Sequence, residues 1–227
     1  MPDRRSGPAH LLLKGINRIK ARGPGEVGAL LFDRAAKAIR SEDELIVLAR
    51  SPDGPRPSAS GLEFREASET DAVAYARDIG TDSARTFAAR RSESTRCFVV
   101  KDGDFMVHAT WMTTRGAWTR ELRAYLRPPQ GEAYVYESFT RAEARGRGVY
   151  PFALGEIAAW LGPRGVGRVW VAVEGGNPPS LRAVTKAGFE ESFRIAYRRR
   201  LGRLWIDPPG GPDPGASAGW VGGAPAR

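Results

Sequence analysis

The seven residues from Ala144 to Tyr150 combine glycine and arginine in a pattern suited to binding an anion. They read A-R-G-R-G-V-Y, so two arginines alternate with two glycines. An alternating, strand-like segment (132–140) precedes them, and an apolar-periodic segment typical of a helix (151–161) follows. Backbone N–H groups of such a loop can converge on an anion, and the helix N-terminus adds partial positive charge at the same point. Because many turns also need glycine, the loop alone indicates a phosphate site only weakly.

The elements around this loop predict a mixed sheet. The expected strands are 62–65, 96–100, 105–112, 132–140, 166–174, 189–200 and 203–206, and the expected helices are 71–79, 82–91, 151–161 and 177–187. The strand–helix–strand unit over 132–174 should be parallel and right-handed. We therefore expect an α/β fold, more closely an α+β mixed sheet, that is mostly antiparallel with one parallel βαβ unit and has helices on both faces.

Composition divides the chain into three parts. Residues 1–60 form a basic appendage, with helices expected at 10–20 and 27–40, a short strand at 44–49 and a Pro/Ser-rich linker at 51–60. Basic amphipathic helices of this kind contact a membrane surface, or pack on a neighbouring domain or partner. Residues 61–206 form the main domain. Residues 207–227 are dominated by Pro, Gly and Ala, and we expect a disordered tail.

Charge and composition narrow the function classes. The chain has 227 residues, 41% of them hydrophobic, which supports a packed core. Its net charge of +9 suits nucleic acid, a phosphorylated cofactor or an acidic membrane, although a general arginine bias would give the same value. Cys97 is the single cysteine and lies in an apolar run, so neither an intramolecular disulfide nor a cysteine-based metal site can form, and the dispersed His10 and His108 predict no metal. With no long apolar span and no secretion signal, a soluble cytoplasmic protein is expected.

A second motif follows the glycine loop by about thirty residues. Asn177-x-x-Ser180, and then Lys186-Ala187-Gly188-Phe189, come directly after the predicted strand 166–174. Together with Arg145–Tyr150, this motif resembles the paired signatures of the Gcn5-related N-acetyltransferases: R/Q-x-x-G-x-G/A, then N-x-x-S/A followed by K-x-G-F. The resemblance covers roughly residues 62–206, and it rests on the two signatures occurring in the expected order of elements.

The resemblance implies a coenzyme A site and names the residues that would form it. In the family the strand before the loop separates from the strand after it, and its freed backbone pairs with the pantetheine arm like an added strand. The loop amides then hold the pyrophosphate, while Asn177 faces the cofactor or, equally well, only caps its helix. The cofactor-binding residues so implied are Ser138, Phe139, Thr140, Arg145, Gly146, Arg147, Gly148, Val149, Tyr150, Asn177 and Ser180, with no metal.

Two positions depart from the family pattern. Tyr150 stands where glycine or alanine is usual, and its ring could cover the cofactor or pack on the sheet; we favour packing. Val184 stands where many members carry a tyrosine that acts as general acid. Protonation of the leaving thiolate would therefore need another donor, a water, or no dedicated acid.

The implied reaction is acetyl transfer from acetyl-CoA to an amine, by direct attack in a ternary complex. A carboxylate can take the amine proton directly or through water. Glu137, nearest the reacting end of its strand, is favoured over Glu132 near the strand start, although both also fit solvated residues or arginine partners. A backbone N–H of Phe139 or Thr140 would hold the oxyanion. Tyr134 and Tyr136 are candidate walls of the acceptor pocket or a proton donor, although aromatic residues on a strand more often serve packing.

Two other function classes stay open. A non-catalytic acyl-CoA-binding or protein-interaction module could keep the same fold, and the valine at position 184 is compatible with it. Nucleic-acid binding lacks a groove-reading motif or aromatic–basic interleaving, so no specific nucleic-acid partner is expected. The acceptor could be a small-molecule or a protein amine.

Overall fold

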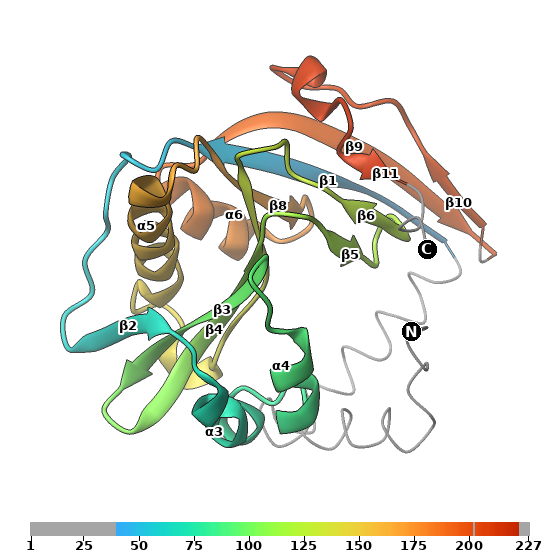
Figure 1. Cartoon of the computed structure of the whole chain (residues 1–227). Helices are drawn as coiled ribbons and strands as arrows, with labels where there is room; N and C mark the ends of the chain where they lie inside the picture. The colour runs from blue at the N-terminus through green and yellow to red at the C-terminus, as the bar shows by residue number, and fades with distance from the viewer. Residues whose placement is uncertain (1–39, 202, 223–227) are drawn as a thin grey trace.

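An eight-stranded sheet runs through the computed structural model, which describes residues 40–201 and 203–222 (Figure 1). The strand order is β10-β9-β1-β8-β7-β4-β3-β2. The strands are β1 (Arg40–Arg50), β2 (Leu62–Glu66), β3 (Thr95–Asp102), β4 (Phe105–Thr113), β7 (Ala133–Thr140), β8 (Val169–Glu174), β9 (Glu190–Arg200) and β10 (Arg203–Ile206). Strands β7 and β8 are parallel, and the other neighbouring strands of this sheet pair antiparallel. The expected mostly antiparallel sheet with one parallel βαβ unit is confirmed.

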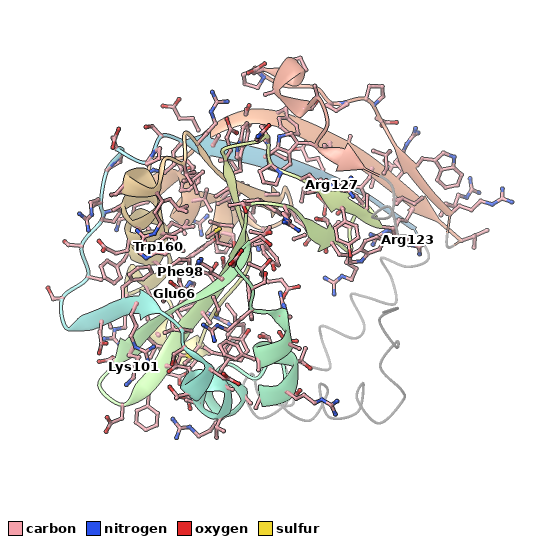
Figure 2. The ribbon with its side chains drawn as sticks, in the orientation of Figure 1. Glu66, Phe98, Lys101, Arg123, Arg127 and Trp160 are labelled. Carbon is pink, nitrogen blue, oxygen red and sulfur yellow. The ribbon has the colours of Figure 1, made fainter. Side chains whose placement is uncertain are left out.

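Helices cover both faces of this sheet, as expected (Figure 1). On one face lie α5 (Val149–Leu161) and α6 (Pro178–Lys186), whose buried residues pack with those of β7 and β8. On the other face lie α3 (Ala72–Asp78) and α4 (Ala84–Arg90), which pack on β4. Figure 2 shows Phe98 of β3 and Trp160 of α5 side by side, and their ring centroids are 5.1 Å apart. Short 3-10 turns occur at Glu69–Asp71, Ala142–Ala144, Gly162–Arg164 and Pro214–Ser217.

Strand β1 belongs to the main sheet, so the predicted boundary at residue 60 is wrong. It pairs with β8 from Leu45 to Arg50 and with β9 from Arg40 to Ala49. The run E-L-I-V-L-A at 44–49 is nearly continuous in apolar residues, as in strands buried on both faces. Its alternate residues do enter the cores on the two faces. The helix predicted at 10–20 lies outside the described residues, as does that at 27–40 apart from Arg40.

The segment predicted to be a linker, 51–60, packs against the helices. Arg50 is buried and donates hydrogen bonds to the carbonyls of Pro55, at 2.8 Å, and Ala187. A Cβ on Gly188 would come within 2.5 Å of the Pro55 side chain, and one on Gly155 within 2.8 Å of Pro57. The segment 51–60, which connects β1 inside the sheet with β2 at its edge, is therefore held against α5 and α6.

Residues 207–222 pack on the domain, so the expected disordered tail is wrong for this segment. Trp220 is fully buried, with its ring centroid 4.9 Å from that of Trp170 and 5.6 Å from that of Tyr134. A second, three-stranded sheet is completed by β11 (Val221–Gly222), which pairs with β6 (Ala124–Leu126) and through it β5 (Ala117–Thr119). The Pro, Gly and Ala content of the segment indicated disorder, because composition does not show how much apolar surface a single tryptophan buries. Within 40–201 and 203–222, no helix has the length and apolar character needed to cross a bilayer.

Candidate active site

Strands β7 and β8 separate partway along their length. They pair only from Ala133, opposite Val169, to Val135, opposite Val171. Beyond this point β8 stays hydrogen-bonded to β1 and β7 stays hydrogen-bonded to β4, but β7 and β8 no longer pair with each other. The edge of β7 from residue 136 to 140 thus faces a gap, as the family resemblance implied.

A β-bulge in β7 lies at the start of this gap. Trp111 of β4 pairs with Tyr136 and Ala109 pairs with Phe139, so Glu137 and Ser138 together face one residue of β4. Glu137 has φ +48°, a left-handed conformation that costs a non-glycine residue about 1–3 kcal/mol. Bulges of this kind re-aim neighbouring groups beside active sites.

The backbone of Thr140 is directed into the gap. Arg141 donates its N–H to Val107 of β4, and peptide groups alternate in direction along a strand. The N–H and carbonyl of Thr140 therefore point away from β4, and the carbonyl accepts a bond from Arg145 Nε at 3.3 Å. By the same alternation Phe139 faces β4, opposite Ala109, so Thr140 is the better oxyanion donor of the two candidates.

The loop at the N-terminus of α5 has room for an anion. Gly146 and Gly148 have φ +79° and +75°, and a Cβ built on either would meet no atom within 4 Å in the described chain. Gly148 is the N-cap of α5, whose first N–H groups have no acceptor within the helix. Arg147 donates to Asp102 at 2.7 Å, so its guanidinium turns toward β3. The open backbone, Arg145 and the helix terminus fit a diphosphate.

Five polar side chains gather beneath the first turn of α5. Ser138 Oγ lies 2.6 Å from Thr110 Oγ1, and His108 Nδ1 lies 2.8 Å from Thr140 Oγ1. Tyr150 hydrogen-bonds to the Ser138 side chain, and its ring centroid is 5.5 Å from that of His108. Burial lowers the pKa of His108 to about 3 and raises the pKa of Tyr150 to about 12. The favoured interpretation of Tyr150, packing on the sheet, matches this position.

On the opposite face of the sheet, Glu137 joins an ion cluster. Arg90 Nη1 lies 2.7 Å from Glu137 Oε2 and 2.5 Å from Asp82 Oδ2. The Arg90 guanidinium also lies 4.1 Å from the centroid of the Trp111 ring and 5.7 Å from that of Tyr136. Burial disfavours the charge on Arg90, but the two carboxylates outweigh burial and raise its pKa.

Sequence reasoning identified Glu137 but missed its partner Arg90 and the Asp82 that also binds Arg90. Arg90 ends a short helix and Asp82 precedes it, and neither has a spacing that shows which strand it faces. Tyr136 lies at this cluster and burial raises its pKa, while Tyr134 stacks on Tyr136 at 5.8 Å. Both tyrosines therefore lie on the side expected for the acceptor.

Glu132 lies away from this cluster. It precedes β7 at the end where β7 and β8 are still paired, and its carboxylate accepts a hydrogen bond from Trp170 Nε1. Five residues of extended strand span about 16 Å, so Glu132 and Glu137 do not meet. The geometry favours Glu137 of the two candidate bases.

The second motif lies at the start of α6. Asn177 is the N-cap of this helix, and its Oδ1 accepts the Ser180 N–H at 3.2 Å. The capping interpretation of Asn177 is thus confirmed, and a coenzyme A contact of Asn177 or Ser180 stays a prediction. Val184 is fully buried in the core with α5. No cluster of three or more His, Cys, Asp or Glu side chains suited to a metal occurs in residues 40–201 and 203–222.

Comparison with known proteins gives the class of fold. No protein-family model matches the sequence, and no curated protein matches it. Among solved structures, the chain is similar to a Gcn5-related N-acetyltransferase from Sphaerobacter thermophilus, with 18% identity, a TM-score of 0.50 and coverage of 78% of this chain. It is also similar to the ribosomal-protein-S18-alanine N-acetyltransferase from Escherichia coli, with 16% identity, a TM-score of 0.45, and coverage of 63% of this chain and 95% of that one.

The chain therefore has the fold of the Gcn5-related N-acetyltransferases. The separated β7 and β8 and the glycine loop occupy the positions that the sequence resemblance implied. The chain spans 56% of the length of the Sphaerobacter protein.

Proposed function

We propose that this protein is an acyl-CoA-dependent N-acyltransferase that transfers acetyl from acetyl-CoA to an amine. The observation that carries the proposal is the separation of β7 from β8 after Val135, directly before the open glycine loop at the N-terminus of α5. Such a gap offers an extended arm the backbone groups of a strand edge. The loop offers a diphosphate a helix terminus and glycine backbone.

In this proposal β7 and the glycine loop bind different parts of acetyl-CoA. The backbone of Ser138 and Thr140 pairs with the pantetheine arm, and the Thr140 N–H stabilises the oxyanion that forms at the thioester carbonyl. Gly146 and Gly148 let the loop amides approach the pyrophosphate, and Arg145 adds charge at the end of β7. As the amine nitrogen forms its bond to the carbonyl carbon, the carbon–sulfur bond breaks and coenzyme A leaves as a thiol.

Glu137 receives the amine proton, directly or through water. Its side chain is 55% exposed, so an acceptor can reach it. With Asp82 and Arg90 it forms a cluster of two carboxylates and one guanidinium, whose net negative charge favours an ammonium group beside it. A free alkylamine is mostly protonated near neutral pH and must lose a proton before it attacks. Because Val184 is apolar and buried, we assign protonation of the thiolate to water rather than to α6.

Two observations favour a second candidate, a non-catalytic acyl-CoA-binding module. The favoured acceptor-side base, Glu137, is already bound to Arg90, and the usual acid position holds Val184. A protein that binds the cofactor without turnover would need neither group.

Release of free thiol from acetyl-CoA in the presence of an amine panel separates the two candidates. The panel contains polyamines, aminoglycosides and peptides with free N-termini. We expect thiol release with at least one amine, and a loss of about 100-fold or more in kcat for Glu137→Gln. Glu156→Gln, which removes another ion-paired carboxylate on α5, is the matched control and should keep full activity. Calorimetric binding of acetyl-CoA without thiol release would support the module, and absence of both would refute both candidates.

We also propose a cytoplasmic location. Cys97 is a free, buried thiol, which is compatible with a reducing compartment. Fractionation of cells producing the untagged protein would test this, and recovery from an extracytoplasmic fraction would contradict it.

A further inference from the structure

The end of the β9–β10 hairpin exposes apolar side chains to solvent. Leu201, in the turn, is 80% exposed, and Trp205 on β10 is 45% exposed. Figure 1 shows this end of β9 and β10 at the right-hand edge of the molecule, far from α5 and α6. Large exposed apolar side chains gathered at one projecting end mark an interaction site more often than scattered ones do.

Arginines surround these apolar groups on one face of the hairpin. Trp205 pairs with Arg198, and Arg203 pairs with Arg200. Residues directly opposite in an antiparallel pair share a face, and alternate residues along a strand do so too. Arg198, Arg200, Arg203 and Trp205 therefore lie on one face, which we call the basic hairpin face. One carboxylate, Asp207, binds Arg198 at 3.2 Å.

A groove of about 240 Å³ opens beside this face. It is lined by Glu42, Arg198, Arg199, Arg200 and Trp205. Arg198 and Arg200 lie on the basic hairpin face together with Glu42, which pairs with Arg198, whereas the Arg199 side chain points to the opposite face. Arg199 is held in place by the carbonyl oxygens of Arg120, at 2.9 Å, and Glu121. Guanidinium forks match the geometry of phosphate oxygens, and an aromatic ring beside them suits a boundary between polar and apolar surroundings.

The β3–β4 hairpin provides an internal comparison. Its end exposes Phe105 to 59%, a fraction similar to that of Trp205. Asp102 and Asp104 flank this turn, but Lys101 precedes them and Arg147 binds Asp102 at 2.7 Å. The Arg77 guanidinium lies 6.0 Å from the centroid of the Phe105 ring. Acidic and basic groups are therefore mixed around Phe105, whereas arginines predominate around Trp205.

We propose that the basic hairpin face docks on an anionic lipid membrane surface. Leu201 and Trp205 enter the headgroup boundary, and the arginines bind lipid phosphates while their aliphatic stems stay in the apolar layer. Each basic residue near an anionic leaflet strengthens binding about fivefold.

Vesicle flotation of the full chain tests the docking surface. The vesicles contain phosphatidylcholine with or without phosphatidylglycerol, and the variants are Leu201→Ser with Trp205→Ser, Arg200→Glu with Arg203→Glu, and Phe105→Ser as the matched control. We expect the wild type to float only with anionic vesicles, more weakly at high salt. The arginine pair should weaken binding about 25-fold or more, the apolar pair about tenfold or more, and the control less than twofold. Circular dichroism and thermal melting verify that each variant is folded.

Three results would overturn the proposal. The wild type could fail to float with anionic vesicles, or both hairpin variants could float as well as the wild type, which would place any binding on another surface. Alternatively, a single-stranded RNA oligonucleotide could bind the wild type and not the hairpin variants while vesicles bind neither. That last outcome would assign the face to nucleic acid.

Discussion

Replacing Gly148 should separate coenzyme A binding from folding. Gly148 has φ +75°, and the position of its missing Cβ is open. In Gly148→Gln, the left-handed backbone costs about 1–2 kcal/mol, because no atom of the chain is displaced. For a protein of this size the melting temperature should fall by about 2–8 °C. The side chain would occupy the space through which a diphosphate approaches the loop. Loss of two charge-assisted hydrogen bonds, each about 1.5–3 kcal/mol, should weaken coenzyme A binding about 100-fold or more.

Gly165→Gln is the matched control for this experiment. Gly165 has φ +77°, equally open surroundings and a position beyond the opposite end of α5. Both variants should lose a similar amount of stability, so a difference in coenzyme A affinity between them reports the position of the substitution. Isothermal titration with coenzyme A should find near wild-type affinity for Gly165→Gln and little binding for Gly148→Gln. If the Gly148 variant bound within about threefold of the control, the assignment of the loop would be wrong.

Three further predictions concern stability. Trp220→Ala should cost about 4 kcal/mol in urea unfolding, because the ring is fully buried among other aromatic rings, whereas a tail without a structural role would leave the midpoint unchanged. Gly188→Ala should cost about 3 kcal/mol of stability, because φ is +80° and the new methyl group would meet Pro55. Its control, Gly103→Ala, has φ +57° and open surroundings and should cost about 1 kcal/mol. Equal costs for the two variants would refute the packing argument. The pKa of His108 is about 3 in the folded chain, against an ordinary value of 6.5 for an exposed histidine, so the unfolded state binds the proton first as pH falls. Stability should therefore fall by up to about 1.4 kcal/mol per pH unit between about pH 6.5 and 3, and a His108→Gln variant with the same slope would contradict this.

The elements near the signatures could be predicted from the sequence because local chemistry determines them. The glycines of the loop adopt the positive φ that their type allows, and Asn177 caps its helix as its type favours. The alternating residues of β7 and the apolar run of β8 likewise form the parallel pair that the strand–helix–strand order implied.

The place of β1 in the sheet could not be predicted, because it depends on long-range pairing. The segment 44–49 has the pattern of a strand, but no local feature shows that it enters between β8 and β9. The proline-rich composition of 51–60 indicated a flexible linker, whereas Arg50 and Pro55 fix it on the helices. Similarly, one buried tryptophan, Trp220, outweighs the disorder that its glycine-rich surroundings indicate.

The candidate site was only partly visible for the same reason. Glu137 followed from its strand position, but the bulge that gives it φ +48° and the Arg90 that binds it arise from tertiary contacts. His108 and Thr110 on β4 complete a polar cluster with β7 that no motif contains. Motifs therefore predicted the candidate cofactor loop, whereas the residues of the candidate acceptor side come together only through tertiary contacts.

The central claim is that coenzyme A binds in the gap between β7 and β8, and a crystal structure of the protein with coenzyme A tests it most directly. We expect the pantetheine arm to lie along the backbone of Ser138 and Thr140, with the pyrophosphate on the amides around Gly146 and Gly148. Coenzyme A bound elsewhere on the protein, or a gap closed by hydrogen bonds between β7 and β8, would contradict the account.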